Sequence, residues 1–262
     1  LKEHYGLEVP LYAVDKVTRN IAREVADYNL SLPEGEVKAK TQVVELDGSM
    51  VPIVEFLDEN AVSTPEAKAD KRKRRQCQWN EIRLCTAHDI ERAEARYGAS
   101  FGGVLEAGCM MQLTARQHGM NHQTHIHGIG DGAPWIADQF DRQFGTQSEF
   151  LIDFYHLCDY LAEAATACTT SEGKEFWIEL QKERFKRNEY QDVMNDLRPH
   201  LEDDEIAEES APVRRCLRYL TNRQQHLNYK DAKARSLPIG SGEVESAHRH
   251  VLQKRLKLSG AW

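Results

Sequence analysis

The feature that most constrains the fold of this chain is the segment 123–157, in which two short β-rich runs flank a helical pattern. The first run, residues 124–129, ends at Gly130-Asp131-Gly132, and the second, residues 150–152, ends at Asp153. A strand, a turn, a helix over residues 134–144 and a second strand indicate a parallel α/β unit. Ligands of such units lie outside the carboxyl ends of the strands, where an acid between two glycines is well placed to hold a cation.

Composition excludes several classes of protein. The 262 residues are 40% hydrophobic and 29% charged, which is typical of a soluble globular protein. No apolar run approaches the roughly 20 residues of a membrane span, and no secretory signal is present. The six cysteines are scattered without close pairs, which favours the reducing cytoplasm over a disulfide framework. The first residue is Leu rather than Met, as in a fragment of a longer protein.

Residues 1–30 predict helices with a break around residues 6–10. The apolar positions of the second helix follow i, i+3, i+4 spacing, which predicts one buried face. They are Leu11, Val14, Val17, Ile21 and Val25. Two interpretations remain open, namely a helix-turn-helix with Arg19 and Arg23 toward DNA, and a helical cap on the core.

The segment 40–55 contains two β-rich runs around Asp47-Gly48, a sequence that predicts a hairpin turn. A turn aspartate is one explanation of Asp47. Residues 78–84 alternate like a third strand, and helical patterns follow at 90–97 and 103–118. The expected order is a three-stranded antiparallel meander, a helix, a strand, a helix and a strand.

That order is typical of the RNase H-like fold, so we expect an α/β protein with a mixed five-stranded sheet and flanking helices. In this fold the first strand ends beside the fourth. Asp47 and Asp131 are then neighbours in space although 84 positions (131 − 47) separate them. Two carboxylates at adjacent strand ends predict a site for a divalent cation, because such ions prefer oxygen ligands.

The rest of the chain predicts an all-α insertion before a final catalytic helix. Long helical patterns cover residues 157–236, including one at 213–229, and the breakers around Gly240 and Gly242 precede the last helix. Acids in its first turn suit the helix dipole, or one of them, Glu243 or Glu245, supplies a third carboxylate to the metal site. The expected units are an N-terminal helical segment (1–36), the first part of the core (37–156), the insertion (157–236) and the C-terminal helix (237–262).

With these pieces together, the chain resembles bacterial insertion-sequence transposases of the DDE superfamily. It is most similar to the Kra-type insertion-sequence group and more distantly similar to Mutator-like elements. The motifs that carry the resemblance are Leu46-Asp47-Gly48, Gly130-Asp131-Gly132-Ala133-Pro134-Trp135, Asp153-Phe154-Tyr155-His156 and Gly240-Ser241-Gly242-Glu243-Val244-Glu245-Ser246, with Arg255 and the terminal Ser259-Gly260-Ala261-Trp262.

The resemblance implies a catalytic and metal-binding triad of Asp47, Asp131 and Glu245 that holds Mg²⁺ or Mn²⁺, as two ions. It implies metal-dependent cleavage and strand transfer of transposon-end DNA. Glu245 is preferred to Glu243 because it matches the acidic position of the family's GSGxxE pattern. Asp153 and His156 match a motif of the Mutator-like relatives and are expected to support the site.

The expected partners are double-stranded DNA, as transposon terminal repeats and target DNA, and further copies of the chain on that DNA; no membrane partner is expected. The expected location is the bacterial cytoplasm, with the nucleoid. The net charge of −8 argues against coating of nucleic acid along the whole chain, but two basic runs favour local contact with DNA. The predicted DNA-binding residues are Lys71, Arg72, Lys73, Arg74, Arg75, Arg249, Lys254 and Arg255.

Two other functions remain open at this point. One is a non-catalytic DNA-binding protein derived from a transposase, and the other is an RNase H-like nuclease that cuts DNA without joining it. A zinc site of His122, His125 and His127 is disfavoured, because His122 lies off at the entrance of the expected strand and no cysteine is near.

Overall fold

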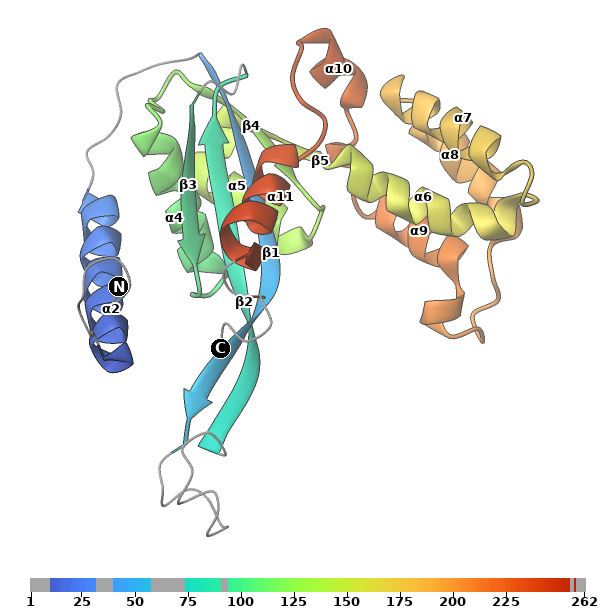
Figure 1. Cartoon of the computed structure of the whole chain (residues 1–262). Coiled ribbons are helices and arrows are strands. Elements are labelled where there is room, and N and C mark those ends of the chain that lie inside the picture. Colours follow the sequence, from blue (N-terminus) through green and yellow to red (C-terminus); the bar gives the residue numbers. More distant parts are fainter. Residues whose placement is uncertain (1–9, 32–39, 58–73, 91–93, 255–256, 258–262) are drawn as a thin grey trace.

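The computed structural model describes residues 10–31, 40–57, 74–90, 94–254 and 257. Five strands form one mixed sheet in the order β3-β2-β1-β4-β5 (Figure 1). The strands are β1 (Thr41–Phe56), β2 (Arg75–His88), β3 (Ala95–Ser100), β4 (His125–Gly130) and β5 (Ser148–Ile152). β1 to β3 pair antiparallel, whereas β4 is parallel to both β1 and β5. The RNase H-like sheet predicted from the order of elements is confirmed.

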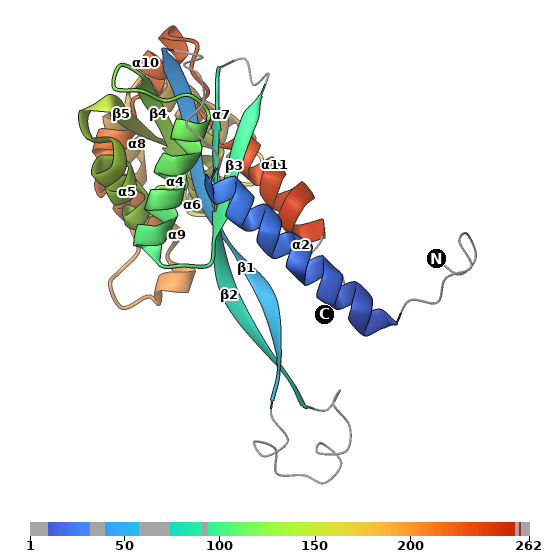
Figure 2. The ribbon, with the colours of Figure 1, turned by 90° about the vertical axis from the view of Figure 1, so that its left-hand side faces the viewer.

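The predicted hairpin turn at Asp47-Gly48 is wrong, because both residues lie inside β1. They pair with Leu84 and Arg83 of β2 in an unbroken ladder that continues to Phe56. The glycine serves close packing instead of a turn: a Cβ at Gly48 would lie 2.3 Å from Oε1 of Glu81. Past Ser49 and Ile82, β1 and β2 pair only with each other and project from the sheet as a two-stranded ribbon (Figures 1 and 2).

The helix predicted over residues 90–97 is also wrong in its described part. Residues 95–97 begin β3, which pairs with β2 from Ala95 opposite His88 to Ser100 opposite Arg83. The side chain of Tyr97 is half exposed on this edge strand. The sequence predicts a strand over residues 78–84 only, but β2 continues to His88. Pairing with this longer strand overrides the local helical periodicity of residues 95–97.

Helices cover the sheet on two faces (Figure 2). α4 (Val104–Gln117) and α5 (Pro134–Phe144) pack on one face, where Leu46, Met111 and Phe140 belong to one core cluster. α11 (Gly242–Ala247) packs on the other face, where Val244 contacts a cluster of β1 and β2 residues that includes Leu84. A π-helical segment, His248–Gln253, continues α11. Because side chains alternate along β1, Leu46 faces α4 and α5 whereas its neighbours Glu45 and Asp47 face α11.

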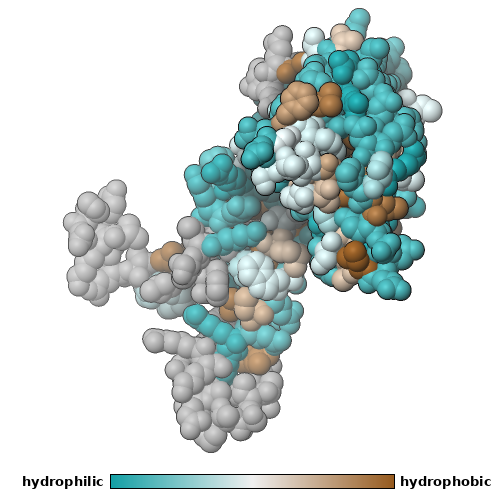
Figure 3. Space-filling model, turned by 90° about the vertical axis from the view of Figure 1, so that its right-hand side faces the viewer, coloured by the Kyte–Doolittle hydropathy of each residue, from teal (hydrophilic) through white to brown (hydrophobic). Residues whose placement is uncertain are grey.

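The insertion forms a separate helical layer with its own core beside β5 (Figure 1). Its helices are α6 (Phe154–Cys168), α7 (Lys174–Lys186), α8 (Tyr190–Leu197), α9 (Pro212–Thr221) and α10 (Tyr229–Ala234). The single helix predicted over residues 213–229 is wrong, because α9 ends at Thr221 and α10 starts at Tyr229. Figure 3 shows that the surface on this side of the molecule is mostly hydrophilic, with apolar residues in separate places.

The N-terminal helix α2 (Leu11–Ser31) forms as predicted, but its apolar face is not buried. Val17, Ile21 and Val25 each expose at least half of their surface. The helix stands to one side of the sheet in Figure 1. The expectation that this face packs on the core is therefore wrong. Across the described ranges, no helix combines the length and the apolar character needed to cross a membrane.

Candidate active site

Asp47 lies in β1 just past the point where the pairing with β4 stops. That parallel pairing runs as far as Glu45, so Asp47 comes close to the turn that follows β4. Its Oδ1 accepts a hydrogen bond from the Gly48 amide at 2.8 Å. Burial raises the pKa of Asp47 to about 6, and the nearby charges of Asp131 and Asp153 add to the rise. The two aspartates predicted as neighbours thus interact electrostatically.

Asp131 is the first residue after β4, and three contacts fix its turn. Its Oδ1 accepts a hydrogen bond from the Ala133 amide at 2.7 Å, an Asx turn. Gly132 has a φ of +81°, a conformation that glycine adopts without strain. From α9, the Tyr219 hydroxyl donates to the Asp131 carbonyl at 2.7 Å, and Arg223 Nε donates to the Gly132 carbonyl. The insertion therefore holds the backbone that presents the Asp131 carboxylate.

The two glutamates at the start of α11 point to different places. Glu245 is exposed and lines a cavity together with Asp47 and Asp131. Glu243 points toward β3, where its Oε1 accepts a hydrogen bond from the Tyr97 hydroxyl at 2.5 Å. The residue that shares a cavity with the two aspartates is therefore Glu245, which the family pattern favours.

Asp153 caps helix α6 and binds the loop before α11. Its Oδ1 accepts from the amides of Tyr155 and His156, at 2.6 and 2.9 Å. Its Oδ2 accepts from the amide of Ser241 at 2.5 Å and from the Ser241 hydroxyl. Four hydrogen bonds occupy both carboxylate oxygens, so Asp153 acts as a structural link between α6 and α11.

His156 lines the same cavity from the first turn of α6. Its ring packs edge-on against Tyr160 at a centroid distance of 5.6 Å, and Tyr160 stacks on Tyr219 at 4.1 Å. The positive charge of a protonated His156 would lower the pKa of Asp47, whereas burial raises it. His156 is thus held between the insertion and the carboxylates.

The cavity that these residues line has a volume of about 440 Å³, and we call it the carboxylate cavity. Its lining residues are Asp47, Asp131, Asp153, Tyr155, His156, Asp159, Ser241 and Glu245. Five of the eight are acids, and none is Lys or Arg. Within the described ranges, however, no three His, Cys, Asp or Glu side chains lie close enough together to hold a metal ion. The acids surround a common space without converging on one point.

Sequence reasoning missed His248, the first residue of the π-helical segment. Its side chain is 4% exposed, and Nε2 lies 3.4 Å from Oδ2 of Asp47. Burial lowers the pKa of His248. Sequence reasoning also missed Tyr219 and Arg223, which are separated by 88 and 91 positions from the carbonyl groups they bind. His248 begins a π-helical segment shortly after Glu245, and π-helical turns are frequent at functional sites. The sequence carries no signal for such a turn.

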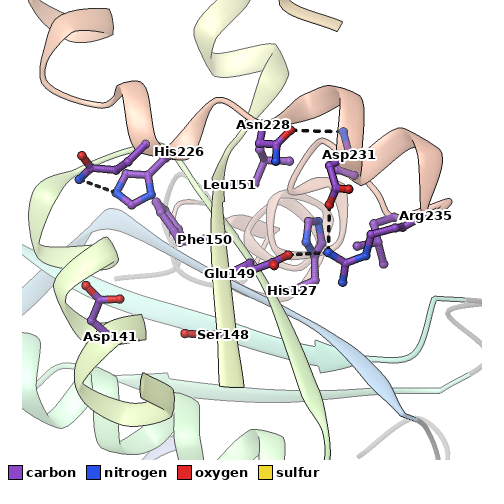
Figure 4. Close-up of a pocket in the computed structure, with 13 residues that line it drawn as sticks. His127, Asp141, Ser148, Glu149, Phe150, Leu151, His226, Asn228, Asp231 and Arg235 are labelled. Carbon is purple, nitrogen blue, oxygen red and sulfur yellow. Dashed lines mark hydrogen bonds and ion pairs between the residues drawn. The ribbon is translucent and has the colours of Figure 1, made fainter. Parts of the chain in front are cut away.

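A second cavity, of about 300 Å³, lies beside the edge strand β5, and we call it the edge cavity (Figure 4). Glu149 and Asp231 line it, and the guanidinium group of Arg235 binds both carboxylates. His127 also lines it and shares a 2.8 Å hydrogen bond with the Pro238 carbonyl. His125 lies 3.5 Å from Glu149. The histidines considered for zinc on this strand are thus engaged with oxygen atoms of the protein.

The described members of the predicted DNA-binding set lie in two places. Arg74 and Arg75 are at the start of β2, at the far end of the projecting ribbon. Arg249 and Lys254 are exposed on and just after the π-helical segment. The remaining predicted residues, Lys71, Arg72, Lys73 and Arg255, lie outside the described residues.

Three basic residues of α7 are paired with acids. Lys182 and Lys186 of α7 each bind a glutamate three positions earlier, at 2.7 Å. Arg184 binds Asp196 of α8. Acids of the insertion partly neutralise these positive charges. The basic residues of α7 therefore attract phosphate less than the same number of unpaired basic residues would.

The sequence matches no protein-family model and, at a significant level, no curated protein sequence. Fold and cavity are therefore the observations that bear on function.

Proposed function

We propose that the chain is a transposase of the DDE type, which cleaves and joins DNA at the ends of a transposon with the help of divalent cations. One observation carries the proposal. Asp47, Asp131 and Glu245 come from three distant segments of an RNase H-like fold and line one cavity beside the carboxyl ends of the parallel strands β4 and β5. Carboxylates in that position fit phosphodiester chemistry with metal ions.

The lining residues fit the Mg²⁺ or Mn²⁺ ions that the proposal requires. Carboxylate oxygens are the preferred ligands of both ions. Burial is the largest cause of the raised pKa of Asp47, and the negative charges of Asp131 and Asp153 add to it. A bound cation would favour the ionised carboxylate against both effects. Asp47, Asp131 and Glu245 would hold two such ions, which activate the attacking oxygen and stabilise the leaving oxygen of an in-line displacement. Because the three carboxylates do not converge in this structure, binding of a shared ion would require their side chains to rotate toward the cavity that they line.

The other residues of the cavity orient these carboxylates. Asp131 keeps one oxygen on the Ala133 amide, which fixes the plane of the carboxylate. Tyr219 and Arg223 hold the carbonyl groups of the turn. His156 lines the cavity, where it would support the metal-binding carboxylates or contact a DNA phosphate. Each contact limits the motion of a group that acts in the chemical step.

DNA binding is proposed for two basic surfaces. One is the end of the β1–β2 ribbon, with Arg74 and Arg75, and a two-stranded ribbon fits a groove of the duplex. The other is the π-helical segment that continues α11 beyond Glu245, with Arg249 in the segment and Lys254 just after it. Both would contact phosphates and make binding salt-dependent. Assembly of several copies on paired DNA ends and a place in the bacterial nucleoid are part of the same proposal.

The test is to incubate purified protein with DNA that carries the transposon's terminal repeats and with Mn²⁺. The proposal expects nicking at the transposon end and joining of that end to target DNA. Nicking without joining would favour an RNase H-like nuclease instead. Binding without any cleavage, under conditions where the protein is folded and Mn²⁺ is present, would favour a non-catalytic DNA-binding protein and overturn the proposal.

A further inference from the structure

Glu45 is a buried carboxylate that the proposed reaction does not use. It lies in the centre of the sheet, because β1 there is flanked by β2 on one side, opposite Thr86, and by β4 on the other, beside Ile129. Its side chain is fully buried. A glutamate in such a place is rare and costly unless its oxygens are bonded. Its presence calls for a role that a hydrophobic residue would not fill.

Both oxygens of Glu45 have partners. Oε2 accepts a hydrogen bond from the amide of Val244 at 2.6 Å, across 199 positions of sequence. Oε1 lies 3.5 Å from Nε2 of His88, which is also fully buried. The other ring nitrogen of His88 is 2.6 Å from the Asp89 carbonyl. The carboxylate is thus oriented by the β2 histidine and directed at the last helix.

Val244 is the third residue of α11, where amide groups have no partner within the helix. A side chain at the N-cap usually accepts one of these amides, but Ser241 makes no such bond. Glu45 supplies the acceptor from β1 instead. A charged acceptor at the start of a helix forms a strong hydrogen bond and also interacts favourably with the helix dipole.

The bond ties together the two elements that carry proposed catalytic acids. Glu45 and Asp47 are two positions apart on β1 and share the face of the sheet toward α11. Glu245 directly follows Val244. One strand therefore presents Asp47 and also fixes the backbone beside Glu245.

We propose that Glu45 is a positioning residue, whose buried carboxylate sets the place of Glu245 in the carboxylate cavity. This inference rests on the proposed function for the role of Glu245. Two further tethers restrain the same turn, from Tyr97 to Glu243 and from Asp153 to the Ser241 amide. They act on the residues before and at the start of α11, whereas Glu45 acts at the position adjacent to Glu245.

The test uses two substitutions of Glu45, one that changes the length of the side chain and one that changes its charge. Glu45→Asp keeps the negative charge but withdraws the carboxylate by one methylene, too far to accept from the Val244 amide. Glu45→Gln keeps the reach and the acceptor oxygen but removes the charge. The matched control is Gln42→Asn, which also shortens a fully buried polar side chain of β1 and loses a hydrogen bond, that to the His118 carbonyl. Gln42 shares the face of β1 with Leu46, toward α4 and α5, so it lies on the side of the sheet away from α11.

Calorimetry measures Mn²⁺ binding by each full-length variant without DNA, and cleavage assays give kcat and KM for DNA. Glu45→Asp is expected to weaken Mn²⁺ binding by about 10- to 100-fold, as for loss of a group that orients a ligand. Its kcat falls while KM for DNA is unchanged. Mn²⁺ binding by Glu45→Gln stays within about threefold of the wild type, because the glutamine oxygen still accepts from the Val244 amide. The small loss reflects the weaker hydrogen bond of a neutral acceptor. Gln42→Asn lowers thermal stability but leaves Mn²⁺ binding unchanged.

The two proposals fail in different ways. If the wild type binds Mn²⁺ and Glu45→Asp alone weakens that binding, but no variant cleaves DNA, the positioning role holds and the transposase proposal does not. If the wild type cleaves DNA and Glu45→Asp behaves like Glu45→Gln or like Gln42→Asn, the positioning role is refuted. Hydrogen exchange at the Val244 amide provides a readout that is independent of catalysis. It accelerates in Glu45→Asp and not in Glu45→Gln if the bond is as described.

Discussion

The carboxylate cavity and the edge cavity both contain acids and histidines at the sheet, but the acids have different partners. In the edge cavity, Arg235 binds Glu149 and Asp231, and the negative charges are neutralised in place. In the carboxylate cavity, Lys and Arg are absent from the lining residues, and Asp47 has a pKa raised to about 6. The first arrangement stabilises the folded chain, whereas the second costs stability.

This contrast indicates which cavity is suited to chemistry. A carboxylate whose charge is disfavoured by burial and by neighbouring acids persists where it serves another purpose, and groups with such perturbed pKa values cluster at functional sites. Paired acids at an edge strand need no such purpose, because they join β5 to the segment before α11. Substitutions in the edge cavity therefore serve as controls for substitutions in the carboxylate cavity.

Asp131→Ala is expected to reduce cleavage of transposon-end DNA by about 10³-fold or more, the scale for loss of a group that acts in the chemical step. DNA binding should remain close to that of the wild type. The matched control is Asp231→Ala, which removes an aspartate from the edge cavity. Quantitative cleavage and mobility-shift assays decide, and full cleavage by Asp131→Ala would disprove the assignment.

The two glutamates of α11 give a comparison within one helical turn. Glu245→Gln is expected to lower kcat by at least about 10²-fold because a metal-binding carboxylate is lost. Glu243→Gln keeps a polar partner for the Tyr97 hydroxyl and should change kcat by less than about tenfold. Parallel steady-state kinetics distinguish them. The reverse order of effects would move the third carboxylate to Glu243.

Asp47→Asn is expected to stabilise the metal-free protein above about pH 6. The raised pKa means that the folded state keeps its proton between the ordinary value of 3.8 and about 6, so unfolding becomes easier as pH rises through that range. The Asp47 side chain is 36% exposed, so we discount the shift for solvent screening to about 1 kcal/mol.

Thermal denaturation tests this prediction. A gain of about 1 kcal/mol corresponds to a rise in Tm of about 2–4 °C for a protein of this size. The gain should shrink toward pH 4, where the carboxyl group is protonated in both states. A Tm for Asp47→Asn that lies below the wild type at neutral pH would contradict the account that burial and neighbouring acids disfavour the charge of Asp47.

Glu149→Gln is expected to destabilise the protein by less than about 1 kcal/mol, because its ion pair with Arg235 is solvent-exposed. Cleavage and Mn²⁺ binding should not change. Chemical denaturation at low and high salt gives the measurement, and the loss should be smaller at high salt. A large loss of cleavage would mean that the edge cavity is functional.

Much of the fold could be predicted from the sequence because its signals are local. The helix over residues 134–144 has the same bounds as α5, since its apolar periodicity and its proline at the first turn define it. The nearness of Asp47 and Asp131 followed from the order of elements, because that order fixes which strands are adjacent. These inferences needed no contact between distant residues.

Other features depend on contacts that leave no local signal. Gly48 pairs with Arg83 inside β1, and the end of the Glu81 side chain lies where its Cβ would be, so the turn pattern misled. The exposed face of α2 has the periodicity of a buried one. Glu45 looks like one more polar residue of a strand, although it binds an amide 199 positions away. Such pairings become visible only once the chain is folded.

The most direct test of the central claim is Mn²⁺ binding to the DNA-free protein near neutral pH, measured by calorimetry. We expect the wild type to bind, and Asp47→Asn, Asp131→Asn and Glu245→Gln each to weaken binding by at least about tenfold. Glu149→Gln, from the edge cavity, should bind like the wild type. A wild type that does not bind Mn²⁺, or binding that survives Glu245→Gln unchanged, would contradict a shared cation site of the three acids.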